Sequence, residues 1–149
     1  MADQADHDHR QLVVFTLGAE HYALPIQMVN EIIRYSEPRS VASPNDWVRG
    51  VISLRGRIVP VYDVATRLGL RCELTEQSKI VIVEAGAETA GVIVDSVEEV
   101  LTVSADQIES APGADPAMIE SIVRIGDRLI VLLTIGAIFA EAAELPAAA

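Results

Sequence analysis

Basic residues are scarce in this chain of 149 residues, which has 22 Asp and Glu against 11 Lys and Arg and a formal net charge of −11. A protein that binds nucleic acid needs Lys and Arg to displace the counterions of the phosphates, and one that docks on anionic lipid needs them for attraction. The charge balance therefore argues against nucleic-acid binding and against direct contact with a membrane.

Cysteine and long apolar runs are nearly absent as well. The single Cys72 cannot form an internal disulfide, which fits a reducing cytosol. The longest apolar run, Leu129 to Ala140, has about 12 residues, fewer than the roughly 18 that would span a bilayer. The N-terminus, Met1 to His9, is polar and acidic and shows no secretory signal. We expect a soluble, cytoplasmic protein.

Motifs that bring catalytic groups together are also missing. The chain has no glycine-rich phosphate loop, no G-x-S-x-G and no H-E-x-x-H. His7 and His9 flank Asp8, but two histidines in a polar tail are more often without function than ligands of a metal. Asp63 and Asp95 end apolar strands, where cap or turn roles are more common than acid–base chemistry. We expect no enzyme activity, no metal and no cofactor.

Aliphatic residues dominate what the chain does contain. Half of the residues are hydrophobic and only 4% are aromatic. Val and Ile are stiff at χ1 and favour strands. About ten short β-rich runs, grouped five and five and separated by turn residues, are typical of small barrels. The pattern predicts an all-β fold with short helices, in which two small barrels pack side by side.

The stretch Val48–Leu70 contains two β-rich runs joined by Arg55-Gly56. Gly56 can take positive φ at no steric cost, so a tight hairpin is expected there. Asp63 can cap a short helix, which Gly69 ends. Two interpretations of Arg55, at the hairpin tip, remain open. Either it forms an ordinary surface pair with Glu31, worth at most about 1 kcal/mol, or no pair at all, or it fixes a loop that partner proteins recognise.

The chain also carries an internal repeat with a period of about 70 residues. Aligning Leu54 with Ile125 places Leu54–Leu68 on Ile125–Phe139, and aligning Val29 with Val97 places Val29–Ile32 on Val97–Val100. A fixed period is stronger evidence than any single propensity. We interpret the repeat as two copies of one small unit. The expected parts are a disordered tail at 1–10, a first barrel at about 11–72, a second barrel at about 79–134, a closing helix at about 135–144 and a frayed end at 145–149.

Two segments resemble the signatures of the CheW family, the coupling proteins of bacterial chemotaxis. Val48–Asp63 reads V-R-G-V-I-S-L-R-G-R-I-V-P-V-Y-D and is similar to G-x-x-N-L-R-G-x-x-x-P-V-x-D-L. Gly91–Val97 is similar to the second signature, G-x-x-V-D-x-V. The resemblance extends from about Gln11 to Phe139. The matching signature positions are Gly50, Gly56, Pro60, Asp63, Gly91 and Asp95.

The resemblance implies a single CheW-like domain over 11–144, built from two tandem five-stranded SH3-like β-barrels. It implies a non-catalytic adaptor that couples the cytoplasmic tips of methyl-accepting chemoreceptors to the regulatory domain of a CheA-type histidine kinase, at membrane-associated receptor clusters. The receptor tip is expected in the groove between the barrels and the kinase at a barrel end. By matching positions, the receptor-binding residues are Val29, Arg55, Val97 and Val100, and the kinase-binding residues are Glu31 and Ile32, with Glu31 paired to Arg55.

The chain departs from the family pattern at a few positions. Ser53 stands where Asn is usual, and Val64-Ala65 where Leu-Arg is usual. Gly113-Ala114 stands where some members carry an aromatic residue that serves a second kinase contact, which closes rings in receptor arrays. Two alternatives therefore stay open: an adaptor of a paralogous pathway that controls pili or a second-messenger enzyme, and a decoy that binds only one partner. A simple core role for Val29 and Ile32 is also open.

Overall fold

The computed structural model describes residues 9–71, 73–136 and 139, and most of these residues lie in strands. In chain order the strands are β1 (His9–Leu17), β2 (Glu20–Pro25), β3 (Val29–Arg34), β4 (Val48–Leu54), β5 (Arg57–Tyr62), β6 (Lys79–Ala85), β7 (Glu88–Val94), β8 (Ser96–Ser104), β9 (Ile108–Glu109), β10 (Ile119–Ile125) and β11 (Arg128–Leu133). The short helical elements are η1 (Ile26–Met28), α2 (Val64–Arg67) and η2 (Ala105–Gln107). The expectation of a β chain with short helices is confirmed.

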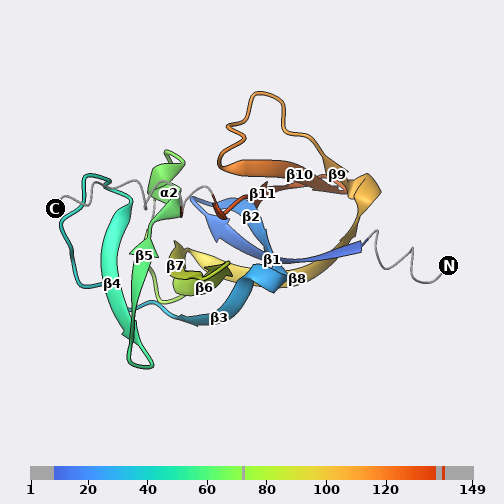
Figure 1. Cartoon of the computed structure of the whole chain (residues 1–149). Coiled ribbons are helices and arrows are strands. Elements are labelled where there is room, and N and C mark those ends of the chain that lie inside the picture. The colour runs from blue at the N-terminus through green and yellow to red at the C-terminus, as the bar shows by residue number, and fades with distance from the viewer. Residues whose placement is uncertain (1–8, 72, 137–138, 140–149) are drawn as a thin grey trace.

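Hydrogen bonding divides the strands into two sheets. Sheet A has the order β8-β1-β2-β11-β10-β9, and sheet B has the order β3-β6-β7-β5-β4. The pairs β2–β11 and β5–β7 are parallel, and the other pairs are antiparallel. Figure 1 shows the β4–β5 hairpin at one end of the molecule and β9–β10 at the other, with β1, β2, β6 and β7 between them.

Each sheet takes strands from both halves of the chain. In sheet A, β1 pairs with β8 and β2 pairs with β11. In sheet B, β3 pairs with β6 and β5 pairs with β7, and β4 pairs with β5. The expected split into barrels at about 11–72 and 79–134 therefore does not match the strand pairing. The connections give the physical reason. β7 and β8 are joined by Asp95 alone, which is too short for the two-residue loop of a common hairpin, so β8 continues into the other sheet.

The internal repeat is nevertheless visible in the order of the strands. The alignment of Leu54 with Ile125 places β4 on β10 and β5 on β11, and that of Val29 with Val97 places β1 on β6, β2 on β7 and β3 on the central part of β8. Under this replacement the order β3-β6-β7-β5-β4 becomes β8-β1-β2-β11-β10, which is the order of sheet A without β9. The chain is thus two copies of one unit that have exchanged their first hairpins.

The central strands are buried on both faces because they serve two cores. In β1, Leu12 and Val14 belong to a cluster within sheet A, whereas Phe15 and Leu17 belong to a larger cluster shared by both sheets. β7 is buried from Ala90 to Val94, as its continuous apolar run predicts. We call the larger cluster, whose members include Phe15, Val81, Val92 and Leu133, the shared core.

The ends of the chain lie partly outside the described residues. β1 begins at His9, two residues before the predicted start, and residues 1–8 are not described. Of the closing helix expected at about 135–144, the structure describes residues 135, 136 and 139, and the Phe139 N–H donates to the Ile135 carbonyl at 3.3 Å. The frayed end at 145–149 is not described. Among the described residues, no helix is long and apolar enough to cross a membrane.

Candidate functional site

The edge strand β3 carries three of the residues expected to bind partners. It hydrogen-bonds to β6 on one side only. Val29 lies opposite Val83 and Ile32 lies opposite Val81, and both partners belong to the shared core. Cross-strand partners share a face of the sheet, so Val29 and Ile32 lie on the same face. Val29 packs against the shared core, whereas Ile32 is 40% exposed, so a simple core role is wrong for Ile32.

The edge strand β8 of sheet A repeats this arrangement. It pairs with β1, with Val97 opposite Phe15 and Val100 opposite Val13. Val97 packs against the shared core, and Val100 is 54% exposed. Each edge strand therefore holds one valine at the core and one exposed aliphatic side chain three residues further on.

A β-bulge makes the spacing of three residues possible. In a regular strand, side chains three residues apart point to opposite faces. In β3 the register jumps between Val29 and Glu31, so no residue of β6 lies opposite Asn30 in the ladder. In β8 the jump skips Glu98 in the same way. The bulge turns the later residues of each strand to the other face, which brings the two aliphatic side chains together.

Arg55 lies at the tip of the β4–β5 hairpin and contacts β3. Arg55 and Gly56 both have positive φ, 53° and 81°, as the common two-residue turn requires. Holding an arginine in this region costs on the order of 1 kcal/mol. The Nη2 of Arg55 donates to Glu31 Oε2 at 2.6 Å, with the side chains 72% and 21% exposed. The expected pairing is present, and it ties edge strand β3 to a hairpin at the opposite edge of sheet B.

Two of the signature positions are explained by close backbone approaches. Gly50 has φ 143°, and a Cβ there would lie 2.0 Å from the Arg39 carbonyl oxygen, because Arg39 and Val51 exchange two backbone hydrogen bonds. Gly91 lies in β7 where a Cβ would lie 2.6 Å from Ile80 Cγ2. Both glycines therefore serve the fold.

Pro60 and Gly56 have more local roles. Pro60 lies opposite Val51 in β5, just before the two residues that pair with β7, so its missing N–H falls outside the parallel pairing. A Cβ added at Gly56 would meet nothing within 4 Å, so only its positive φ favours glycine.

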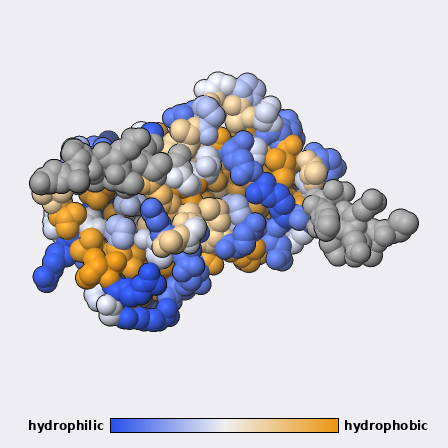
Figure 2. Space-filling view, in the orientation of Figure 1, coloured by the Kyte–Doolittle hydropathy of each residue, from blue (hydrophilic) through white to orange (hydrophobic). Residues whose placement is uncertain are grey.

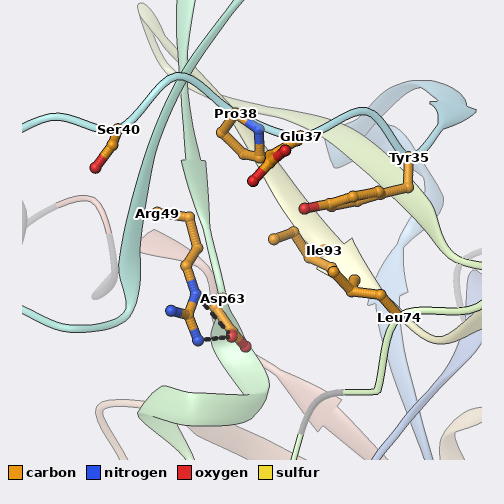
Figure 3. A pocket seen from close by; sticks show the side chains of 8 residues that line it. All are labelled: Tyr35, Glu37, Pro38, Ser40, Arg49, Asp63, Leu74 and Ile93. Atoms are coloured by element: carbon orange, nitrogen blue, oxygen red, sulfur yellow. Dashed lines mark hydrogen bonds and ion pairs between the residues drawn. The ribbon is translucent and has the colours of Figure 1, made fainter.

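Asp63 is a buried structural carboxylate that sequence reasoning placed correctly as a helix cap. Its Oδ1 accepts from the Thr66 N–H at 3.0 Å at the start of α2. Its Oδ2 accepts from Arg49 Nη2 at 2.7 Å and Nε at 3.1 Å, and from the Thr66 hydroxyl at 2.8 Å. Figure 3 shows Arg49 reaching Asp63 at one side of a pocket that Tyr35, Leu74 and Ile93 line on the other. The role of Arg49 was missed, although the hairpin register, with Val48 opposite Tyr62, brings it beside Asp63.

Asp95 fills the connection between the two sheets. Its N–H donates to the Thr16 carbonyl at 2.9 Å, and its Oδ2 accepts from the Gly18 N–H at 2.9 Å. Its Oδ1 is buried without a hydrogen-bond partner in the described part of the chain. Burial raises the pKa of Asp95, the hydrogen bonds from Gly18 and Ala19 lower it in part, and the nearby Glu73 and Asp63 add to the increase.

The described residues offer no metal centre. Within 9–71, 73–136 and 139, no group of three or more His, Cys, Asp or Glu side chains is placed to hold a metal ion. The polar side chains at the signature positions instead hold the backbone: Asp63 caps α2, and Asp95 joins the sheet connection to the β1–β2 turn. The exposed features at the edges are aliphatic side chains and ion pairs, which suit contact with another protein.

The sequence analysis missed two exposed aliphatic residues that lie in strands. Ile58 in β5 is 70% exposed and Leu129 in β11 is 52% exposed, and the internal repeat places one on the other. Figure 2 shows apolar surface over the β4–β5 hairpin, bordered by hydrophilic surface at its tip. The signal was available, because strand alternation puts Ile58 on the face opposite the buried Val59.

Comparison with known proteins identifies the family. A family model described as a CheW-like domain matches residues 11–143. The chemotaxis protein CheW of Bacillus subtilis is 32% identical over 133 residues, which cover 86% of this chain and 85% of that protein. Protein PilI of Pseudomonas aeruginosa is 35% identical over 86 residues, which cover 56% of this chain and 47% of PilI.

A solved structure shares the architecture. The scaffolding protein TtCheW from Thermoanaerobacter tengcongensis matches with a TM-score of 0.80 and 33% sequence identity, covering 85% of this chain and 84% of that one. The two sheets described above therefore correspond to the two SH3-like β units of CheW proteins, and the expected β architecture with two units is confirmed. The C-terminal helix of that expectation lies mostly outside the described residues. Since the family model spans nearly the whole chain and both the sequence and the fold match CheW proteins along most of their length, this chain belongs to the CheW family of chemotaxis scaffold proteins.

Proposed function

We propose that this chain is a non-catalytic adaptor that couples the cytoplasmic tips of chemoreceptors to a CheA-type histidine kinase. The observation that carries the proposal is the pair of edge strands, β3 and β8, which turn exposed aliphatic side chains, Ile32 and Val100, outward from one shared core. Exposed apolar side chains on sheet edges favour docking of another protein. Membership in the CheW family supports a scaffold function.

The edge strand β8 is assigned to the receptor alone, whereas β3 and the adjacent hairpin tip carry residues assigned to both partners. We assign Val97 and Val100 on β8, together with Val29 and Arg55, to the receptor tip. We assign Glu31 and Ile32 on β3 to the regulatory domain of the kinase. Apolar contacts at such surfaces supply most of the affinity, and charges set the register. Because Arg55 holds Glu31 at 2.6 Å, loss of Arg55 should also disturb the kinase contact. The adaptor would act in the cytoplasm, beneath membrane-associated receptor clusters.

Replacing Val100 with Asp tests the receptor assignment. A charge in a desolvated apolar contact is costly, so binding to a soluble receptor-tip fragment should weaken at least tenfold in isothermal titration calorimetry, while the thermal unfolding midpoint stays close to that of the wild type. Val41→Asp is the matched control, because Val41 is 43% exposed and lies outside both edge strands. Equal binding by Val100→Asp and the wild type would contradict the assignment.

Arg55→Ala tests the coupling itself. In a complex reconstituted from adaptor, kinase and receptor, the variant should stimulate the kinase less than the wild type, because Glu31 loses its partner and the hairpin tip loses its contact with β3. Arg39→Ala, a change of the same residue type on the loop before β4, serves as the control. Full stimulation by Arg55→Ala would remove Arg55 from the proposed interface.

A paralogous pathway that controls pili is the second candidate, and the similarity to PilI favours it. The same surfaces would then bind a kinase and a receptor of the pilus system. Co-purification of the tagged protein from its own cells separates the two, because recovery of a pilus-associated kinase in place of the chemotaxis kinase would replace the first candidate with the second.

A further inference from the structure

The second edge strand carries an ion pair that corresponds to Glu31–Arg55. Arg128 Nη1 donates to Glu99 Oε2 at 3.1 Å, and the two side chains are 40% and 41% exposed. In the internal repeat Glu99 is the equivalent of Glu31, and Arg128 is the equivalent of Arg57. The pair joins β8 at the edge of sheet A to the start of β11, three positions away in the sheet.

The position of Glu99 links it to the bulge. Glu98 is the residue that the register skips, and Glu99 is the first residue after it that pairs again, opposite Val14. Glu31 has the same place after Asn30 in β3. A bulge disrupts the ladder locally, and on an edge strand no second neighbour supports it. In both copies a glutamate directly after the bulge is held by an arginine from a hairpin.

The surrounding residues differ between the copies, but this arrangement is kept. Asn30 is replaced by Glu98, and Arg55-Gly56 at the first hairpin tip is replaced by Gly126-Asp127 at the second. The arginine that binds the glutamate comes from the turn in one copy and from the first residue of the following strand in the other. The two halves thus form equivalent ion pairs with arginines at different positions, which argues that the pair has the same role in both.

We propose that Glu99 and Arg128 are positioning residues, which hold the bulged segment of β8 so that Val97 and Val100 face the receptor tip together. The proposal rests on the receptor assignment of β8 made above. The pair is half exposed, and such pairs contribute little to global stability. The ion pair instead raises the fraction of molecules in which β8 has the arrangement that can bind. The affinity for the receptor tip falls in proportion when that fraction falls.

Calorimetric titration with a soluble receptor-tip fragment tests the proposal. Glu99→Gln should weaken binding about fivefold, while binding of the kinase regulatory domain and the thermal midpoint stay at wild-type values. The double variant Glu99→Arg/Arg128→Glu should recover most of the affinity. The control is Glu109→Gln, which breaks the Arg124–Glu109 pair at 2.6 Å on β9 and β10 of the same sheet and should leave both partners unaffected.

Hydrogen exchange on the free protein measures the positioning role without a partner. Amides of residues 97–101 should exchange faster in Glu99→Gln than in the wild type or in Glu109→Gln. Unchanged exchange, an equal loss of kinase binding or a double variant without recovery would overturn the proposal. If the wild type does not bind the receptor tip but Glu99→Gln still speeds exchange in β8, the receptor assignment fails and the positioning role stands.

Discussion

Two glycines, Gly50 and Gly91, occupy positions where a single added carbon would collide with a neighbouring strand or loop. At Gly91 the neighbour is the Cγ2 methyl of the fully buried Ile80, and at Gly50 it is the Arg39 carbonyl. The Arg39–Val51 bridge fixes the loop before β4 to the strand that carries the Arg55 hairpin. Gly50 therefore affects the placement of Arg55, five positions away, which we assign to the receptor contact.

Gly50→Ala should destabilise the fold by about 2 kcal/mol or more, because it adds both a clash at 2.0 Å and an unfavourable φ. Gly56→Ala is the matched control, since its φ is also positive but its Cβ would meet open space; it should cost only about 1 kcal/mol. Urea unfolding measures both changes. Similar values for the two variants would show that the clash is relieved by movement of the loop.

Asp95 should make stability depend on pH. Its pKa is raised in the folded state, chiefly by burial, so the folded protein holds the proton to higher pH than the unfolded chain does. The contribution of this bound proton to the stability of the fold is complete below the ordinary pKa of Asp and is lost as the pH rises through the raised pKa.

Asp95→Asn tests this pH dependence, because asparagine remains neutral and keeps an oxygen for the Gly18 N–H. It should be more stable than the wild type at about pH 7, and this advantage should shrink toward about pH 4. Thermal unfolding at both pH values measures the difference, and an advantage of equal size at both would contradict the effect of burial.

At the scale of elements, the sequence predicted features that depend on neighbouring residues, but not features that depend on which strands pair. The Arg55-Gly56 turn and the Asp63 cap were found because each depends on residues within a few positions of one another. The common face of Val97 and Val100 was not derivable from their spacing, since strand alternation alone would separate them. It depends on the bulge at Glu98, and the bulge exists only through the pairing of β8 with β1, about 85 residues earlier in the chain. The family resemblance supplied these residues where the strand pattern could not.

The α2 cap offers a test at the element scale. Asp63→Ala removes the hydrogen bonds from Thr66 and from Arg49 to the carboxylate, and should cost about 2 kcal/mol in urea unfolding. Asp63→Asn keeps an acceptor for the Thr66 N–H and should cost less, although its amide nitrogen cannot accept from Arg49 as Oδ2 does. An equal loss for both would assign the stabilisation to the contact with Arg49 rather than to the cap.

The whole molecule consists of two equivalent units that have exchanged their first hairpins. The expected division into one barrel from each half of the chain was therefore wrong. The repeat predicted the two units correctly, but it carries no information on whether a hairpin pairs with its own unit or with the other. The short connections decide the matter, because Ile26–Met28 and Asp95 lead each first hairpin directly into a strand of the other sheet.

Cutting the chain between α2 and β6 tests this exchange. Fragments 1–75 and 76–149 should each be largely unfolded by circular dichroism, because neither holds all the strands of a sheet. An equimolar mixture should regain the β spectrum of the whole protein. Fragment 26–95, which holds every strand of sheet B, provides the comparison and should keep more strand signal than either half. A folded 1–75 fragment would contradict the exchanged pairing.

The one-residue link at Asp95 has a mechanical consequence. Because the strands of the two halves are interleaved and β7 leads into β8 through a single residue, we expect the two sheets to move as one body. A displacement imposed at one edge strand would then reach the other edge strand as a rotation of both sheets together.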